Sequence, residues 1–121
     1  MARLLVVDDD PHVRELVPKL AYKRVGSALE VLHASDVGEA LAICRAGPVA
    51  VVLSDFFMPE IDGPELVRRL RASHPGVRAL LMTGDSATVG KQLPESDQPV
   101  RDKADLDAIV DEAVQLALDG L

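Results

Sequence analysis

The stretch LLVVDDDP, residues 4–11, places four apolar side chains directly before three aspartates and a proline. A short continuous apolar run is typical of a strand that is buried on both faces of a sheet. Carboxylates packed this closely repel one another, and the repulsion is strong where solvation is poor. We therefore expect a positive group to lie beside Asp8, Asp9 and Asp10.

Along the rest of the chain, short apolar runs alternate with longer amphipathic stretches. This alternation predicts an α/β protein with a parallel sheet wrapped by helices. The predicted strands are 3–7, 29–33, 49–54, 77–82 and a weaker one at 99–101. The predicted helices begin after the caps Asp10 and Asp36, at Pro64 and at Ala104. Residues 84–99 contain too many Gly, Pro and polar residues for more than a short helix.

Composition narrows the class of protein. The 121 residues, 48% of them hydrophobic, predict one globular domain over 1–121. The net charge of −7, with scattered Lys and Arg, argues against nucleic acid as a partner. No apolar run approaches the roughly 20 residues of a membrane span, and no leader precedes Leu4, so we expect a cytoplasmic protein without a membrane partner. The single cysteine, Cys44, excludes a disulfide within the chain and is expected to be a core residue.

Polar side chains follow several of the predicted strands. Ligands of open parallel sheets bind beyond the carboxyl ends of the strands. Asp8 and Asp9 follow the first strand, Asp55 follows the third, Thr83 the fourth, and Lys103 the fifth. The carboxylates suit Mg²⁺, and the hydroxyl and ammonium could bind a negatively charged group carried on one of them. This combination predicts phosphoryl transfer.

Each of these residues also has a simpler interpretation when taken alone. Asp8 and Asp9 could cap the following helix, and Asp55 could belong to a turn. Thr83 could simply end a strand, and Lys103 could be a solvated surface charge. Their joint occurrence at strand ends favours a functional site.

Three segments carry a family resemblance. VVDDDPHVRELV, VVLSDFFMPEIDGPELVRRLR and ALLMTGD resemble the main motifs of the receiver domain of two-component response regulators. The most specific signal is an aspartate, Asp55, followed by Pro59 and Gly63. The resemblance implies a flavodoxin-like (βα)5 doubly wound sheet with strand order 2-1-3-4-5. Combined with the pattern of residues 84–99, it predicts a short or irregular fourth helix.

The resemblance also implies residue roles. Asp55 would be the phosphoacceptor, taking its phosphoryl group from a phosphohistidine on a sensor histidine kinase or histidine phosphotransfer protein. Asp9 would bind Mg²⁺ directly, Asp8 mainly through a water, and the backbone carbonyl of Phe57 would be a further ligand. Thr83 would turn its hydroxyl toward the phosphoryl oxygens. Receivers of this family catalyse their own phosphorylation and dephosphorylation.

The fifth strand departs from the family pattern. Receivers usually carry Lys-Pro after this strand, whereas here Asp102 stands in the place of the lysine and Lys103 in that of the proline. The long lysine stem leads us to expect that Lys103 still reaches the site, with Arg101 or no contact as the alternatives. The aromatic switch residue of the family is absent, because Pro99 or Val100 occupies its position.

Other functions remain as alternatives. GDSATVGKQ resembles a phosphate-binding loop, but five residues separate Gly84 from Gly90 where the motif needs four, and Gln92 replaces its Ser or Thr. An aspartate-dependent phosphatase would need the Asp-x-Asp pattern that Asp8 and Asp10 provide only as part of an acidic run. The main alternative is a receiver fold that docks partners without phosphorylation. A weak homodimer, and a stand-alone regulator or a piece of a larger protein such as a hybrid kinase, are also left open.

Overall fold

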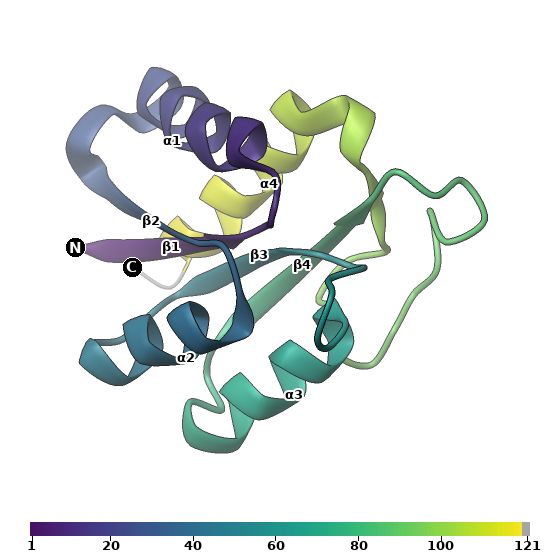
Figure 1. The fold of residues 1–121 in the computed structure, drawn as a ribbon. Helices are drawn as coiled ribbons and strands as arrows, with labels where there is room; N and C mark the ends of the chain where they lie inside the picture. Colours follow the sequence, from purple (N-terminus) through teal and green to yellow (C-terminus); the bar gives the residue numbers. More distant parts are fainter. Residues whose placement is uncertain (120–121) are drawn as a thin grey trace.

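The computed structural model describes residues 1–119 and shows a parallel sheet with helices on both faces (Figure 1). The five strands lie in the order β2-β1-β3-β4-β5, and every neighbouring pair is parallel. This arrangement confirms the flavodoxin-like order. The elements are β1 (Ala2–Val7), α1 (Pro11–Val25), η1 (Gly26–Ala28), β2 (Leu29–Ala34), α2 (Val37–Ala46), β3 (Val51–Asp55), α3 (Gly63–Ser73), β4 (Arg78–Thr83), β5 (Arg101–Asp102), η2 (Lys103–Asp105) and α4 (Leu106–Asp119).

Two hydrophobic cores lie on opposite faces of the sheet. Successive side chains of a strand point to opposite faces, so Leu4 and Val6 of β1 belong to one core and Leu5 and Val7 to the other. Helices α1 and α4 cover the first core, and α2 and α3 cover the second (Figure 1). Cys44 is buried in the second core, as expected.

The helix starts follow the capping signals. Asp10 and Asp36 accept hydrogen bonds from the backbone N–H groups of His12 and Glu39 at the starts of α1 and α2. Asp62, which the sequence interpretation did not single out, caps α3 in the same way. Across residues 1–119, the structure contains no helix with the length and apolar character that a membrane crossing requires.

The connection between β4 and β5 has no helix. Residues 84–100, all of which the structure describes, form turns, bends and irregular backbone, so the short or irregular fourth helix of the prediction is replaced by a connection without any helix, as the Gly, Pro and polar content of this segment explains. Two hydrogen bonds hold the segment together, from the Gly90 N–H to the Val100 carbonyl and from the Val100 N–H to the Lys91 carbonyl, both 2.8 Å. A third joins the Asp97 N–H to the Ala79 carbonyl of β4 at 2.9 Å.

The end of the chain differs from the prediction in its boundaries. The fifth strand is Arg101–Asp102 rather than 99–101, because Val100 bonds to the preceding loop instead of to β4. The last helix begins at Leu106 rather than at Ala104, because Asp102 caps a 3-10 turn at Lys103–Asp105. Lys103 is the first residue of this turn and lies at the carboxyl ends of the strands.

Candidate functional site

The strand register brings the predicted site residues to one edge of the sheet. Val7 of β1 pairs with Ser54 of β3, so Asp8 and Asp55 follow at neighbouring positions. Asp55 in turn pairs with Met82 of β4, directly before Thr83. Thr83 pairs with Asp102, so Lys103 continues from the adjacent strand.

Three carboxylates meet at this edge. Ligand oxygens of Asp8, Asp9 and Asp55 all lie within 4.8 Å of one another. Asp8 is fully buried, Asp55 is 9% exposed, and Asp9 is exposed. The cluster therefore has a buried side within the sheet and an open side toward solvent.

The positive group expected beside the aspartates is the ammonium of Lys103. Its Nζ lies 2.8 Å from Asp8 Oδ2 and 3.2 Å from Asp55 Oδ2. Burial of the ammonium by itself lowers its pKa, but the carboxylates of Asp8 and Asp55 outweigh this, and the pKa of Lys103 is raised above its ordinary value. The shifted lysine thus lies against both carboxylates.

Asp8 is held by the chain that follows it. Its Oδ1 accepts a hydrogen bond from the Asp10 N–H at 2.9 Å, and its backbone carbonyl accepts one from the Arg14 guanidinium at 2.8 Å. Burial raises the pKa of the Asp8 carboxyl, and the contacts with Lys103 and Asp10 offset this only in part. The sequence interpretation missed Arg14, although its place in the first turns of the helix after the acidic pair could have indicated that its side chain reaches back.

The aspartate cluster fits a divalent cation. Asp8 Oδ2 is buried and has the ionic contact with Lys103, but no aligned hydrogen bond from the described residues. A buried anionic oxygen without an aligned hydrogen bond is stabilised by a bound cation. Carboxylate oxygens are also the ligands that Mg²⁺ prefers. The residues are thus typical of a magnesium site.

Thr83 and Phe57 are the remaining predicted site residues, at the end of β4 and just beyond β3. Thr83 is buried at the end of β4, and its Oγ1 accepts a hydrogen bond from the Asp85 N–H at 3.0 Å. Asp85 also accepts a hydrogen bond from the Thr88 hydroxyl at 2.7 Å. Phe57, two residues beyond Asp55, is 51% exposed, and its ring centroid lies 4.7 Å from that of Phe56. The Phe57 carbonyl as a metal ligand stays a prediction.

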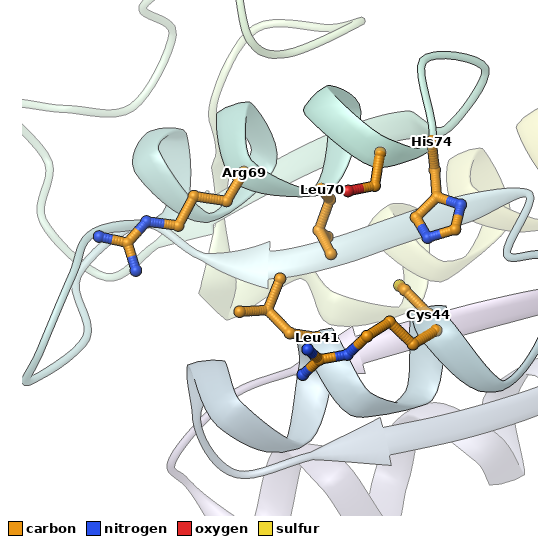
Figure 2. A pocket seen from close by; sticks show the side chains of 7 residues that line it. Leu41, Cys44, Arg69, Leu70 and His74 are labelled. Atoms are coloured by element: carbon orange, nitrogen blue, oxygen red, sulfur yellow. The ribbon is translucent and has the colours of Figure 1, made fainter.

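A small cavity of about 70 Å³ lies elsewhere, between the C-terminal halves of α2 and α3 (Figure 2). Leu41 and Cys44 line it from α2, and Leu70 and His74 line it from the other side. None of the predicted site residues lines this cavity, so it is separate from the aspartate cluster.

Comparison with known proteins agrees with the geometry of the site. Residues 4–93 match the family model described as the response regulator receiver domain. The chain belongs to this family. The receiver is 31% identical over 99 residues to the response regulator receiver protein CpdR of Brucella abortus, a match that covers 82% of this chain and 78% of CpdR. It is also 36% identical over 85 residues to the sensor kinase CckA of Brucella abortus.

The lengths of these relatives differ widely. The match covers 69% of this receiver but only 9% of CckA. Among solved structures, the response regulator TrrA of Thermotoga maritima, in complex with Mg²⁺-BeF, is 27% identical to this receiver, with a TM-score of 0.78. That match covers 96% of this chain and 99% of the TrrA chain.

Proposed function

We propose that this receiver, a single domain over 1–121, takes a phosphoryl group onto Asp55 from a phosphohistidine on a sensor histidine kinase or histidine phosphotransfer protein. The observation that carries this proposal is the meeting of Asp8, Asp9 and Asp55, with the Lys103 ammonium 3.2 Å from Asp55 Oδ2. Nucleophile, metal ligands and a cation for the phosphoryl group would then lie within one small site.

Mg²⁺ would be held by Asp8, Asp9, Asp55 and the carbonyl of Phe57. When bound, it offsets the negative charge of the nucleophile and of the phosphoryl oxygens, which otherwise repel each other. The similarity to TrrA, whose structure contains Mg²⁺-BeF, supports this cofactor.

An Asp55 carboxylate oxygen attacks phosphorus as the bond between phosphorus and the imidazole nitrogen breaks. The imidazole leaves with the electron pair of that bond and takes a proton from water, and Asp55 becomes an acyl phosphate. The Lys103 ammonium, already beside Asp55, pairs with the phosphoryl oxygens, and the Thr83 hydroxyl turns from Asp85 to donate to them. A later attack of water on phosphorus breaks the bond to the Asp55 oxygen, releases inorganic phosphate and restores the carboxylate.

The partner class is supported by the relatives. CckA is described as a sensor kinase, and part of it is 36% identical to this receiver. This similarity supports a histidine kinase as the partner with which the receiver exchanges a phosphoryl group.

Intact mass measurement tests the proposal. The protein is incubated with acetyl phosphate and Mg²⁺, and we expect a gain of one phosphoryl group that Asp55→Asn abolishes. Asp36→Asn is the matched control, because it removes an aspartate that caps a helix elsewhere and asparagine caps equally well. Retention of the gain in Asp55→Asn would assign the phosphoryl group to another residue.

A second candidate function is docking of partners without phosphorylation. The absence of a helix in residues 84–100 favours it, because a face that most receivers build from a helix is built differently here. In that case neither the wild-type protein nor Asp36→Asn gains mass under the same conditions.

A further inference from the structure

Lys103 is held at both ends of its side chain. Its ammonium lies 2.8 Å from Asp8 Oδ2 and 3.2 Å from Asp55 Oδ2. At the other end, Lys103 is the first residue of the 3-10 turn Lys103–Asp105, which leads directly into α4 at Leu106. A lysine side chain is long and flexible, and its rotamer entropy opposes fixing it in one conformation. A fixed backbone therefore contributes to holding the ammonium at the carboxylates.

The strand before Lys103 does not by itself aim the side chain at the carboxylates. β5 consists of Arg101 and Asp102, and successive side chains along a strand point to opposite faces of the sheet. A continued strand would therefore give positions 102 and 103 opposite directions. The chain instead leaves the extended conformation after Asp102, whose φ and ψ are −76° and 121°, and enters the 3-10 turn. The direction of the Lys103 side chain is thus set by the turn.

The start of a helix is an unfavourable place for a cation. The turn and α4 form one continuous helical stretch over residues 103–119, and the free N–H groups at its start favour negative charge. Asp105 and Asp107 follow this preference, whereas Lys103 contradicts it. Residues that break a local preference are expected at functional sites. The carboxylates at the edge of the sheet, and not the helix, therefore account for a lysine at this position.

Asp102 fixes the turn through its side chain. Its Oδ1 accepts a hydrogen bond from the Ala104 N–H at 2.9 Å, as a helix cap does. Its backbone pairs with Thr83 of β4, so the cap joins the turn to the sheet at the level of the site. Asp102 is exposed, and within residues 1–119 its carboxylate forms no ion pair. The cap is therefore the contact through which this side chain can act on the site.

We propose that Asp102 is a positioning residue for the phosphorylation of Asp55, because its cap orients the backbone from which Lys103 reaches the reacting carboxylate. This inference rests on the proposed function of Asp55. Asp102 does not touch the reacting atoms, and its negative charge is not required. A cap at position 102 is required, so Asn, which caps equally well, should replace Asp102, and Ala, which cannot cap, should not.

Rates of phosphorylation test this proposal. They are measured by intact mass with acetyl phosphate and Mg²⁺ in excess. Asp102→Ala should lower the rate about tenfold, because a displaced ammonium loses much of its effect on the reacting atoms. Asp102→Asn should keep the rate within about twofold of the wild type. Asp36→Ala is the matched control, because it removes a cap of the same type at the start of α2 and should leave the rate unchanged.

A double substitution separates positioning from general destabilisation. Lys103→Ala removes the group that Asp102 is proposed to hold, so Asp102→Ala should have no further effect on the rate in that background. A loss of stability would instead lower the rate by the same factor with and without Lys103. The wild type, the two single variants and the double variant are therefore compared under the same conditions.

NMR relaxation of the Lys103 Cε methylene group provides a readout that needs no phosphorylation. In the metal-free protein without phosphodonor, we expect a high order parameter in the wild type, in Asp102→Asn and in Asp36→Ala. Asp102→Ala should show fast motion of the same group. The spectrum of Lys103→Ala assigns the signal among those of the other lysines.

Three rate measurements would overturn the proposal. These are an unchanged rate in Asp102→Ala, an equally low rate in Asp102→Asn, and an equal effect of Asp102→Ala with and without Lys103. The second would show that the charge of Asp102 acts and not its cap. If the wild type gains no phosphoryl group, the proposed function is wrong, and the order parameter decides the positioning by itself. An unchanged order parameter in Asp102→Ala would then refute it.

Discussion

The buried carboxylate of Asp8 favours cation binding at the site but lowers the stability of the metal-free fold. Its carboxylate is fully buried, and one of its oxygens has no aligned hydrogen bond from the described residues. Burial raises its pKa despite the neighbouring Lys103. A buried anion of this kind destabilises the metal-free protein, and a bound cation would remove that penalty.

The first prediction concerns Asp8→Asn. In Mg²⁺-free buffer containing a chelator, we expect this variant to be more stable than the wild type by about 1 kcal/mol, because a neutral amide replaces a buried charge while its oxygen still accepts from the Asp10 N–H. The same variant should lose Mg²⁺ affinity. Urea unfolding and calorimetric Mg²⁺ titration measure the two effects, with Asp36→Asn as the neutral control.

The stability difference between Asp8→Asn and the wild type depends on pH because the pKa of Asp8 is raised in the folded protein. Between the ordinary value of 3.8 and the raised value, the folded protein keeps a proton on Asp8 that the unfolded chain has lost. The stability of the wild type therefore falls as the pH rises through this window. Asp8→Asn lacks this contribution, so its advantage should grow with pH and then stay constant. An advantage that shrinks with rising pH would contradict the assigned direction.

Residues at strand ends were the most predictable part of the site. Asp8, Asp9 and Asp55 meet because the first two follow β1 and the third ends β3 in one parallel sheet, a placement at strand ends that the apolar pattern predicts. The contact of Lys103 could not be derived from the pattern of strands alone, because the sequence does not reveal that Asp102 would cap a 3-10 turn and direct the next residue inward. Arg14 was missed because its partner is the backbone carbonyl of Asp8, and only its place in the first turns of the helix pointed to that contact.

At the scale of elements, the junction between β3 and α3 depends on a close approach of backbone. A Cβ added to Gly63 would lie 2.6 Å from the Asp55 carbonyl oxygen and 3.2 Å from the Cα of Phe56. Both atoms are backbone and cannot move without moving the nucleophile. The motif therefore has glycine at position 63 because a side chain there would clash with the backbone of Asp55 and Phe56.

We predict that Gly63→Ala destabilises the protein by about 1–3 kcal/mol, the usual range for forced overpacking, and slows phosphorylation of Asp55. Gly76→Ala is the matched control, since a Cβ at Gly76 meets nothing within 4 Å. Thermal unfolding and the intact mass assay measure the two effects. Equal effects of the two substitutions would show that loss of glycine flexibility, and not the clash, is responsible.

An ion-pair cluster anchors the 84–100 segment in place of a helix. The Asp97 carboxylate lies 2.9 Å from Arg71 of α3 and 2.6 Å from Arg78 of β4. Arg71 also donates to the Glu95 carbonyl at 2.8 Å. The Gly and Pro content of the segment predicted a short or irregular helix where the structure has none, and ion pairs between distant residues could not be predicted without the fold.

Asp97→Asn should therefore destabilise the protein by about 1–2 kcal/mol, because it leaves two half-buried guanidinium groups without their anion. Glu30→Gln, which removes the more exposed pair with Arg3 at 3.4 Å, should change the stability by less than about 0.5 kcal/mol. Urea unfolding compares the two variants. If Arg71→Gln combined with Asp97→Asn costs the full sum of the single changes, the two residues are not coupled.

At the scale of the whole molecule, both cores share one sheet, and the aspartate cluster lies at the ends of the neighbouring strands β1 and β3. Leu4 and Leu5 are neighbours in β1 but belong to different cores. Loss of either core would therefore remove packing from the strands that carry Asp8 and Asp55. We expect the domain to unfold in one cooperative transition that includes the site.

Mg²⁺ binding should then stabilise the entire domain. Above the dissociation constant, each tenfold rise in Mg²⁺ should add about 1.4 kcal/mol to the free energy of unfolding, because the ion binds the folded protein alone. Asp9→Asn should abolish this slope with little effect on the metal-free protein, since Asp9 is exposed. Calorimetric unfolding at constant ionic strength, adjusted with NaCl, separates ion binding from screening. Two transitions, of which only one shifts with Mg²⁺, would show that the cores unfold separately and that the site is coupled to one of them.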